Sequence, residues 1–130
     1  MSISYTAHCG NGIFLYDRKV IVTSKLRDHQ SSQCGIIRQN NTTFFVSYET
    51  IVCEITDDFL HCYGTFSQTT RKQIGWFLEQ MRKDYCYRVD LATYQTAKRC
   101  YEKGVEVNLY NGDERKASDG IIQTIGVKAI

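Results

Sequence analysis

Residues 47–85 constrain the fold of this chain more than any other stretch, because they encode two strands followed directly by an amphipathic helix. If Asp57 and Asp58 form a two-residue turn, the strands on either side pair as a hairpin in one register. That register places Cys53 opposite Cys62. Side chains alternate across a strand, so one face should gather apolar residues: Ile51, Cys53, Ile55, Leu60 and Cys62. The opposite face should carry Val52, Glu54, Thr56, Phe59, His61 and Tyr63.

A helix is predicted after the hairpin, from about residue 68 to residue 85. Ser67 or Thr69 can cap its first turn, because a hydroxyl oxygen accepts from an otherwise unpaired amide, and Thr70 with Gln73 is a shifted alternative. The stripe expected to cover the sheet consists of Ile74, Phe77, Leu78, Met81 and Tyr85. The side chains expected to face solvent are Arg71, Lys72, Glu79, Gln80, Arg82 and Lys83.

The rest of the chain is less strongly patterned. Apolar runs before the hairpin, separated by polar segments, predict an antiparallel β-meander. The polar segment 24–33 has no apolar period and is predicted to be an exposed loop. Asp90 is predicted to cap a second helix at about residues 91–103. Residues 105–110 alternate as in an edge strand, and an exposed loop is predicted over residues 113–120.

These patterns predict an α+β fold, with an antiparallel β-meander of about five to seven strands covered by two α-helices. One domain spanning residues 1–130 is expected, since 130 residues with 42% hydrophobic content suffice for one core. The net charge of +2 neither demands nor excludes a polyanionic partner. We find no basic segment followed by an apolar run near Met1, and no stretch of the ~20 apolar residues that a membrane span needs. We therefore expect a cytoplasmic protein without a membrane partner.

Catalytic and metal-binding chemistry is weakly supported. Zinc sites usually contain ligand pairs two to four residues apart, and no such cysteine pair exists here. His61 and Cys62 are adjacent on a strand, so they point to opposite faces and cannot easily share an ion. A cysteine activated by histidine has no local signature, and Glu54 is a more natural cross-strand partner for His61. No nucleotide-binding loop or hydrolase motif is present. We therefore expect no enzyme, no cofactor and no metal, with Cys53 and Cys62 as buried apolar residues.

Two kinds of binding remain open on this reading. Nucleic-acid binding would use the nine tyrosines together with the basic residues of both predicted helices. These are Arg71, Lys72, Arg82, Lys83, Lys98, Arg99 and Lys103. Acidic residues are mixed among them, however, and helix surfaces normally carry such charges. Protein binding needs no special chemistry beyond exposed tyrosines, arginines and a polar rim.

A resemblance to a group of known proteins makes the protein-binding alternative more specific. Ser47-Tyr48-Glu49-Thr50-Ile51-Val52, then Tyr63, then Ser67-Gln68-Thr69-Thr70-Arg71-Lys72-Gln73 with Trp76-Phe77-Leu78, resembles small uncharacterised proteins of phages and mobile elements in Gram-positive bacteria. The resemblance covers residues 47–78. The common form has histidine soon after the paired threonines, whereas this chain has Gln73, so no histidine-based role transfers.

Small phage proteins of this kind are similar to anti-defence factors, including anti-CRISPR proteins that block an effector by binding it. The resemblance implies a stoichiometric inhibitor of a bacterial defence effector, such as a Cas nuclease or its RNA complex, in the host cytoplasm. The alternative is a nucleic-acid-binding phage regulatory protein. The residues expected to bind the partner lie on the first helix and in the 24–33 loop: Arg71, Lys72, Gln80, Arg82, Lys83, Lys25, Arg27 and His29.

Overall fold

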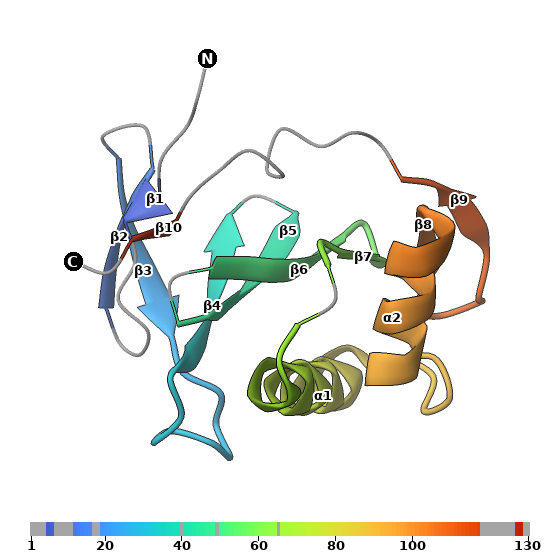
Figure 1. Ribbon diagram of the computed structural model, residues 1–130, viewed down its shortest axis with the longest axis horizontal. Coiled ribbons are helices and arrows are strands. Elements are labelled where there is room, and N and C mark those ends of the chain that lie inside the picture. The colour runs from blue at the N-terminus through green and yellow to red at the C-terminus, as the bar shows by residue number, and fades with distance from the viewer. Residues whose placement is uncertain are drawn as a thin grey trace.

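The protein, seen here as a computed structural model describing residues 5–6, 12–16, 19–39, 41–48, 50–64, 66–117 and 127–128, has the predicted α+β architecture (Figure 1). The helices are α1 (Gln68–Tyr85) and α2 (Tyr94–Lys103). The strands are β1 (Tyr5–Thr6), β2 (Gly12–Tyr16), β3 (Lys19–Ser24), β4 (Cys34–Gln39), β5 (Thr42–Ser47), β6 (Thr50–Thr56), β7 (Phe59–Cys62), β8 (Val105–Asn108), β9 (Glu114–Lys116) and β10 (Val127–Lys128).

The strands form one sheet in the order β10-β1-β2-β3-β4-β5-β6-β7-β8-β9. Neighbours from β1 to β9 are antiparallel, which confirms the predicted meander, and β10 pairs with β1 in parallel. The described residues contain ten strands where about five to seven were expected. The additional ones are β1, β9 and β10, which have only two or three residues each and carry little sequence signal.

The hairpin of β6 and β7 has the predicted register. Cys53 pairs with Cys62, and Asp57 and Asp58 form the turn with φ values of 50° and 67°. Both aspartates are thus in the left-handed region that a primed two-residue turn requires. Because the turn fixes the register, the alternation of faces along the adjoining residues follows from it.

Two residues of β6 depart from the predicted alternation. The register between β5 and β6 shifts between Phe45 and Val46, which pair with Cys53 and Ile51 and leave Val52 as an extra residue. Such a bulge places two successive side chains on nearly the same side of the strand. Val52 therefore joins Cys53 in the main core instead of lying on the opposite face. Ile51, predicted on the face of Cys53, is buried but pairs with Val46 and is not part of that core cluster.

The N-cap of helix α1 is Ser67, the first of the predicted alternatives. The Ser67 side chain accepts a hydrogen bond from the Thr70 amide, and Thr70 and Gln73, the shifted alternative, are buried instead. Both helices pack on one face of the sheet, α1 against β5 and α2 against β7 and β8 (Figure 1). Phe77 lies in the middle of this layer and stacks on Phe45 with ring centroids 4.7 Å apart.

Two boundaries differ from expectation. Helix α2 is capped by Thr93, whose hydroxyl accepts from the Thr96 amide at 3.2 Å, whereas Asp90 pairs with Arg88 and lies before the helix. Residues 114–116, predicted as loop, pair with β8, so β8 is internal rather than an edge strand. Local sequence did not reveal β9 because its side chains are all exposed and lack an apolar period. Neither helix in the described part is both long and apolar enough to cross a membrane.

Candidate functional site

The loop between β3 and β4 lies along one side of α1 instead of projecting freely. Leu26 anchors it in the core with 1% of its surface exposed. The His29 ring stacks on Trp76 of α1, with centroids 3.8 Å apart and planes within 6°. The Arg27 amide donates to Gln80 Oε1 at 2.8 Å. Apolar, aromatic and hydrogen-bonding contacts thus fix the loop to the helix.

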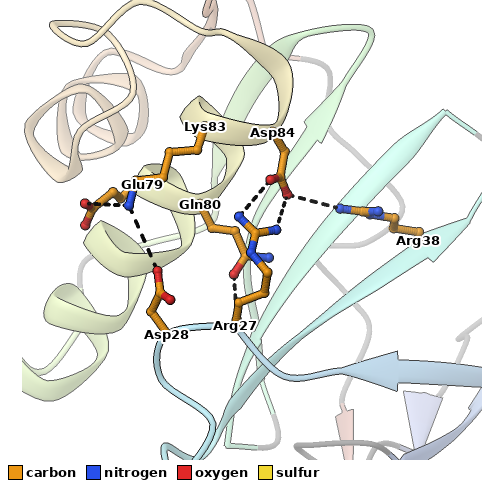
Figure 2. A network of polar contacts seen from close by, with 7 residues as sticks. All are labelled: Arg27, Asp28, Arg38, Glu79, Gln80, Lys83 and Asp84. Carbon is orange, nitrogen blue, oxygen red and sulfur yellow. Dashed lines mark hydrogen bonds and ion pairs between the residues drawn. The ribbon is translucent and has the colours of Figure 1, made fainter.

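Asp84, near the end of α1, joins the loop and the sheet through two arginines (Figure 2). Arg27 binds its carboxylate in bidentate fashion, with nitrogen–oxygen distances of 2.8 and 2.9 Å. Arg38 on β4 lies 3.9 Å from the same carboxylate. The hydrogen bond from Arg27 to Asp84 raises the pKa of the guanidinium above its usual value. Solvent screens exposed pairs of this kind, so we assign them a positional role more than a stabilising one.

Lys83 lies at the outer edge of the same network. Its Nζ atom is 4.0 Å from Asp28 Oδ2 in the loop and 3.5 Å from Glu79 Oε1 one turn earlier on α1 (Figure 2). A hollow of 280 Å³ lies next to this network, lined among others by Lys25 and Gln80. We call the surface formed by Lys25, Arg27, His29, Gln80 and Lys83 the helix–loop surface. It unites five of the eight residues predicted to bind a partner.

The other three predicted residues lie elsewhere on α1. Arg71 and Lys72 line a separate hollow of 380 Å³ with Tyr94 at the start of α2. Arg82 is eleven positions after Arg71, about three helical turns, and so lies on the same flank as Arg71. No hydrogen bond or ion pair involves the Arg82 side chain within the described residues. Lys72 is likewise eleven positions before Lys83, so it lies on the same side of α1 as Lys83 but about three turns away, next to Arg71. The predicted site is therefore divided both around and along one helix.

A group of tyrosines at the C-terminal end of α1 was not among the predicted site residues. Tyr85 and Tyr87 stack with centroids 5.6 Å apart, and Tyr110 lies against Tyr87 at 4.8 Å. Tyr85 and Tyr110 are 38% and 43% exposed. The sequence placed Tyr85 in the buried stripe, but Tyr85 is the last residue of α1 and its side chain is exposed. The pair of tyrosines at positions 85 and 87 is a signal that could have revealed the group.

The sheet face opposite the helices carries a row of polar side chains. His61 on β7 lies between Glu54 on β6, its register partner, and Glu106 on β8. The imidazole Nδ1 is 3.3 Å from Glu106 Oε2 but poorly aligned, and neither ring nitrogen makes a hydrogen bond with described residues. Glu54 instead accepts from the Tyr63 hydroxyl at 2.6 Å. The ionic neighbour of His61 is thus Glu106 and not Glu54, although the predicted register is present.

The thiols of Cys53, Cys62 and Cys100 lie in the core beneath the helices. Burial raises the pKa of each, and the pKa of Cys100 reaches about 12. A nucleophilic cysteine requires the opposite shift, because the thiolate is the reactive form. His61 is on the other face of the sheet from Cys62, so these thiols are not activated by it. Cys9 of the sequence lies outside the described residues.

Metal binding finds no support in the part of the chain that the structure describes. There, no group of three or more His, Cys, Asp or Glu side chains is placed to hold an ion. The described surface offers instead charged and aromatic side chains next to shallow hollows. Such an arrangement is suited to recognition by contact.

Comparison with known proteins gives one match. The family described as "Family of unknown function (DUF8033)" matches residues 16–93, which is more than half of the 130 residues. The matched part includes the 24–33 loop, the hairpin of β6 and β7, and all of α1. No curated protein and no solved structure matches the chain.

Proposed function

The chain belongs to the DUF8033 family of unknown function, and we propose that it is a phage-encoded anti-defence inhibitor that binds a bacterial effector protein stoichiometrically. The observation that carries the proposal is the helix–loop surface, where residues from two segments about fifty positions apart form one continuous surface. Inhibition by occlusion needs no turnover and no cofactor, only a complementary surface. The resemblance to anti-CRISPR-like phage proteins supplies the class of partner.

The rigidity of the helix–loop surface supports a binding role. Association costs less when the side chains and loops of an interface are already ordered. Here Leu26 is buried, His29 is stacked on Trp76, and Arg27 is held by Asp84 and by the amide contact to Gln80. The loop therefore needs little ordering when a partner binds. A loop that only connected two strands would not need this set of contacts.

Plaque formation tests the proposal directly. The protein is expressed in bacteria whose CRISPR–Cas system targets a phage, and the efficiency of plaquing is measured. We expect wild type to restore plaquing and Lys25→Glu/Lys83→Glu to lose this effect, because both substitutions reverse charge on the helix–loop surface. The control Lys98→Glu/Lys103→Glu makes the same charge change on α2 and should behave as wild type.

Purified components give the second readout. Size-exclusion chromatography with light scattering on the protein mixed with the purified Cas effector should show a complex of defined stoichiometry for wild type and for the α2 control. Undiminished interference, together with no complex, would contradict the proposal. If the Lys25→Glu/Lys83→Glu variant is as active as wild type, the protein inhibits the effector through a surface other than the helix–loop surface.

The second candidate is a nucleic-acid-binding regulatory protein. It is favoured by the start of α1, where Arg71 and Lys72 border a hollow beside Tyr94. Neither helix has an acidic residue in its first turn. Its affinity for a DNA duplex should fall steeply with salt, since each neutralised phosphate releases counterions. Arg71→Gln/Lys72→Gln should reduce that salt slope by about two. A flat salt response would remove this candidate.

A further inference from the structure

A third pocket lies at the C-terminal end of α1 and shares Arg38 with the hollow beside the helix–loop surface. Its volume is 330 Å³, and its lining includes the turn residues Asp57 and Asp58 together with Tyr85 and Tyr87. Ile55 and Met81 form part of its lining and are buried in the core. We call it the tyrosine pocket. It combines aromatic rings, carboxylates and apolar surface within one concavity.

The aromatic wall of the tyrosine pocket is held in place by a hydrogen bond and by ring stacking. The Tyr110 hydroxyl donates to the Tyr85 carbonyl oxygen at 2.6 Å, and the Tyr87 hydroxyl donates to Asp58 Oδ1 at 2.9 Å. Burial is the main cause that raises the pKa of Tyr87 above its usual range, and the hydrogen bond to Asp58 raises this pKa further. The Tyr87 hydroxyl therefore remains a neutral donor. The hydrogen bond to Asp58 thus fixes the Tyr87 ring before any ligand arrives, and the Tyr85 ring stacks on it with centroids 5.6 Å apart.

The carboxylates of the pocket come from a rigid turn. Asp57 and Asp58 have φ values of 50° and 67°, and the Leu109 amide donates to the Asp58 carbonyl oxygen at 2.9 Å. The Asp57 side chain has no hydrogen bond or ion pair with any described residue. The lining contains two carboxylates and a single guanidinium, that of Arg38, so its net charge favours a cation.

The position of Arg38 indicates the kind of group that the tyrosine pocket accepts, although Arg38 itself belongs to the lining. Its guanidinium lies over the Tyr85 ring, 5.9 Å from the centroid, which is a cation–π arrangement. Its side chain is 55% exposed and its ion pair is with Asp84, outside the pocket. Within the described residues, no ion pair joins it to Asp57 or Asp58. The Asp57 carboxylate, and the Asp58 oxygen that does not accept from Tyr87, therefore remain available to a second cation.

We propose that the tyrosine pocket binds the guanidinium group of an arginine side chain of the partner protein. The planar cation would lie against the tyrosine rings while the carboxylates of Asp57 and Asp58 accept its N–H groups. The methylene stem would cover the apolar surface beside Ile55. The identity of the occupant rests on the proposed function, but the preference of the pocket for this cation can be measured without a partner.

The test is a titration of the ¹⁵N-labelled protein with N-acetylarginine N′-methylamide, followed by NMR chemical shifts. We expect saturable shifts at the 57–58 turn and at residues 85–87. The citrulline analogue, which has the same shape without the charge, should give none. Asp57→Asn/Asp58→Asn should weaken binding about five- to tenfold, or about 1 to 1.4 kcal/mol in total, because both substitutions remove a negative charge from the pocket.

The double asparagine variant is suited to this test because it should fold. Asparagine tolerates positive φ as well as aspartate does, and the amide oxygen introduced at position 58 could still accept from the Tyr87 hydroxyl. The control Glu79→Gln/Glu102→Gln removes two charges from solvent-facing positions of α1 and α2 and should leave the titration unchanged. Absence of saturable shifts, equal shifts with citrulline, or equal loss in both double variants would each overturn the proposal.

The outcome is separable from that of the proposed function. A complex with the effector that forms without any arginine-dependent shift would remove the tyrosine pocket and leave the helix–loop surface in place. An arginine-specific titration without a complex would establish the pocket and remove that effector as the partner.

Discussion

The buried hydrogen bonds between β5 and α1 give a prediction of stability that can be worked through in detail. Ser47 and Gln73 are each 3% exposed, and the Ser47 hydroxyl donates to Gln73 Oε1 at 2.5 Å. Ser47 Oγ is also 3.1 Å from Thr70 Oγ1. Ser47→Ala removes the donor and leaves a buried amide oxygen without its partner. The expected cost is about 1 to 3 kcal/mol of unfolding free energy.

The partner substitution and the double variant make this prediction sharper. Gln73→Met removes the acceptor but keeps an unbranched side chain of similar length, and Ser47 can still bond to Thr70, so we expect a loss of about 1 kcal/mol. In the double variant both side chains are apolar, so neither one leaves a buried polar atom without a hydrogen-bond partner. Ser47→Ala/Gln73→Met should therefore be at least about 1 kcal/mol more stable than the sum of the single losses implies.

Urea unfolding at 25 °C, followed by circular dichroism, measures the four proteins of this cycle. In thermal unfolding, a loss of 1 kcal/mol in unfolding free energy corresponds to a decrease of about 3 to 5 °C in Tm for a chain of this size. Ser31→Ala, at an exposed loop position, is the matched control and should change stability by less than about 0.5 kcal/mol. Additive losses in the double variant, or a Ser47→Ala cost no larger than that of the control, would refute the reasoning.

Three further predictions concern the core, a helix end and the thiols. Phe77→Ala should cost about 3 to 5 kcal/mol in urea unfolding, because Phe77 is fully buried against Phe45, and a loss below about 2 kcal/mol would contradict its central place. Cys86 ends α1 with φ of 58°, so Cys86→Gly should raise stability by about 0.5 to 1 kcal/mol while Cys86→Ala should not. Burial raises the pKa of Cys100 from about 9 to about 12, so the unfolded chain loses this proton first and stability should fall as the pH rises through that window. Below pH 9 this thiol should have no effect, and Cys100→Ala should lose stability less steeply than wild type when unfolding is measured at pH 8, 9.5 and 10.5 under reducing conditions.

The local elements of the fold were predictable because short-range rules fix them. The turn at Asp57 and Asp58 sets a register with period two, and that register alone placed Cys53 opposite Cys62. The spacing of apolar residues along α1 and the hydroxyl of Ser67 likewise defined the helix and its start. The bulge at Val52 was not predictable in this way, because it depends on how β6 pairs with β5.

The candidate site was only half determined by the sequence. Residue types identified Arg27, Gln80 and Lys83 as binding candidates, but nothing local in the sequence indicates that the 24–33 loop lies along α1. Arg27 and Asp84 are 57 positions apart, and their contact exists because Leu26 is buried and the loop returns across the helix. The tyrosine pocket likewise joins the turn after β6 to residues beyond α1.

The sequence by itself determined the class of fold, the hairpin and the faces of the first helix, because periodicity and turn chemistry act over a few residues. Only the tertiary structure decided which exposed side chains are neighbours. It placed Arg71 and Arg82 on another flank of α1 and Lys72 about three turns from Lys83, and it gathered Tyr85, Tyr87 and Tyr110 into one group. Contacts between distant segments depend on how whole elements pack, and no short sequence pattern encodes that packing.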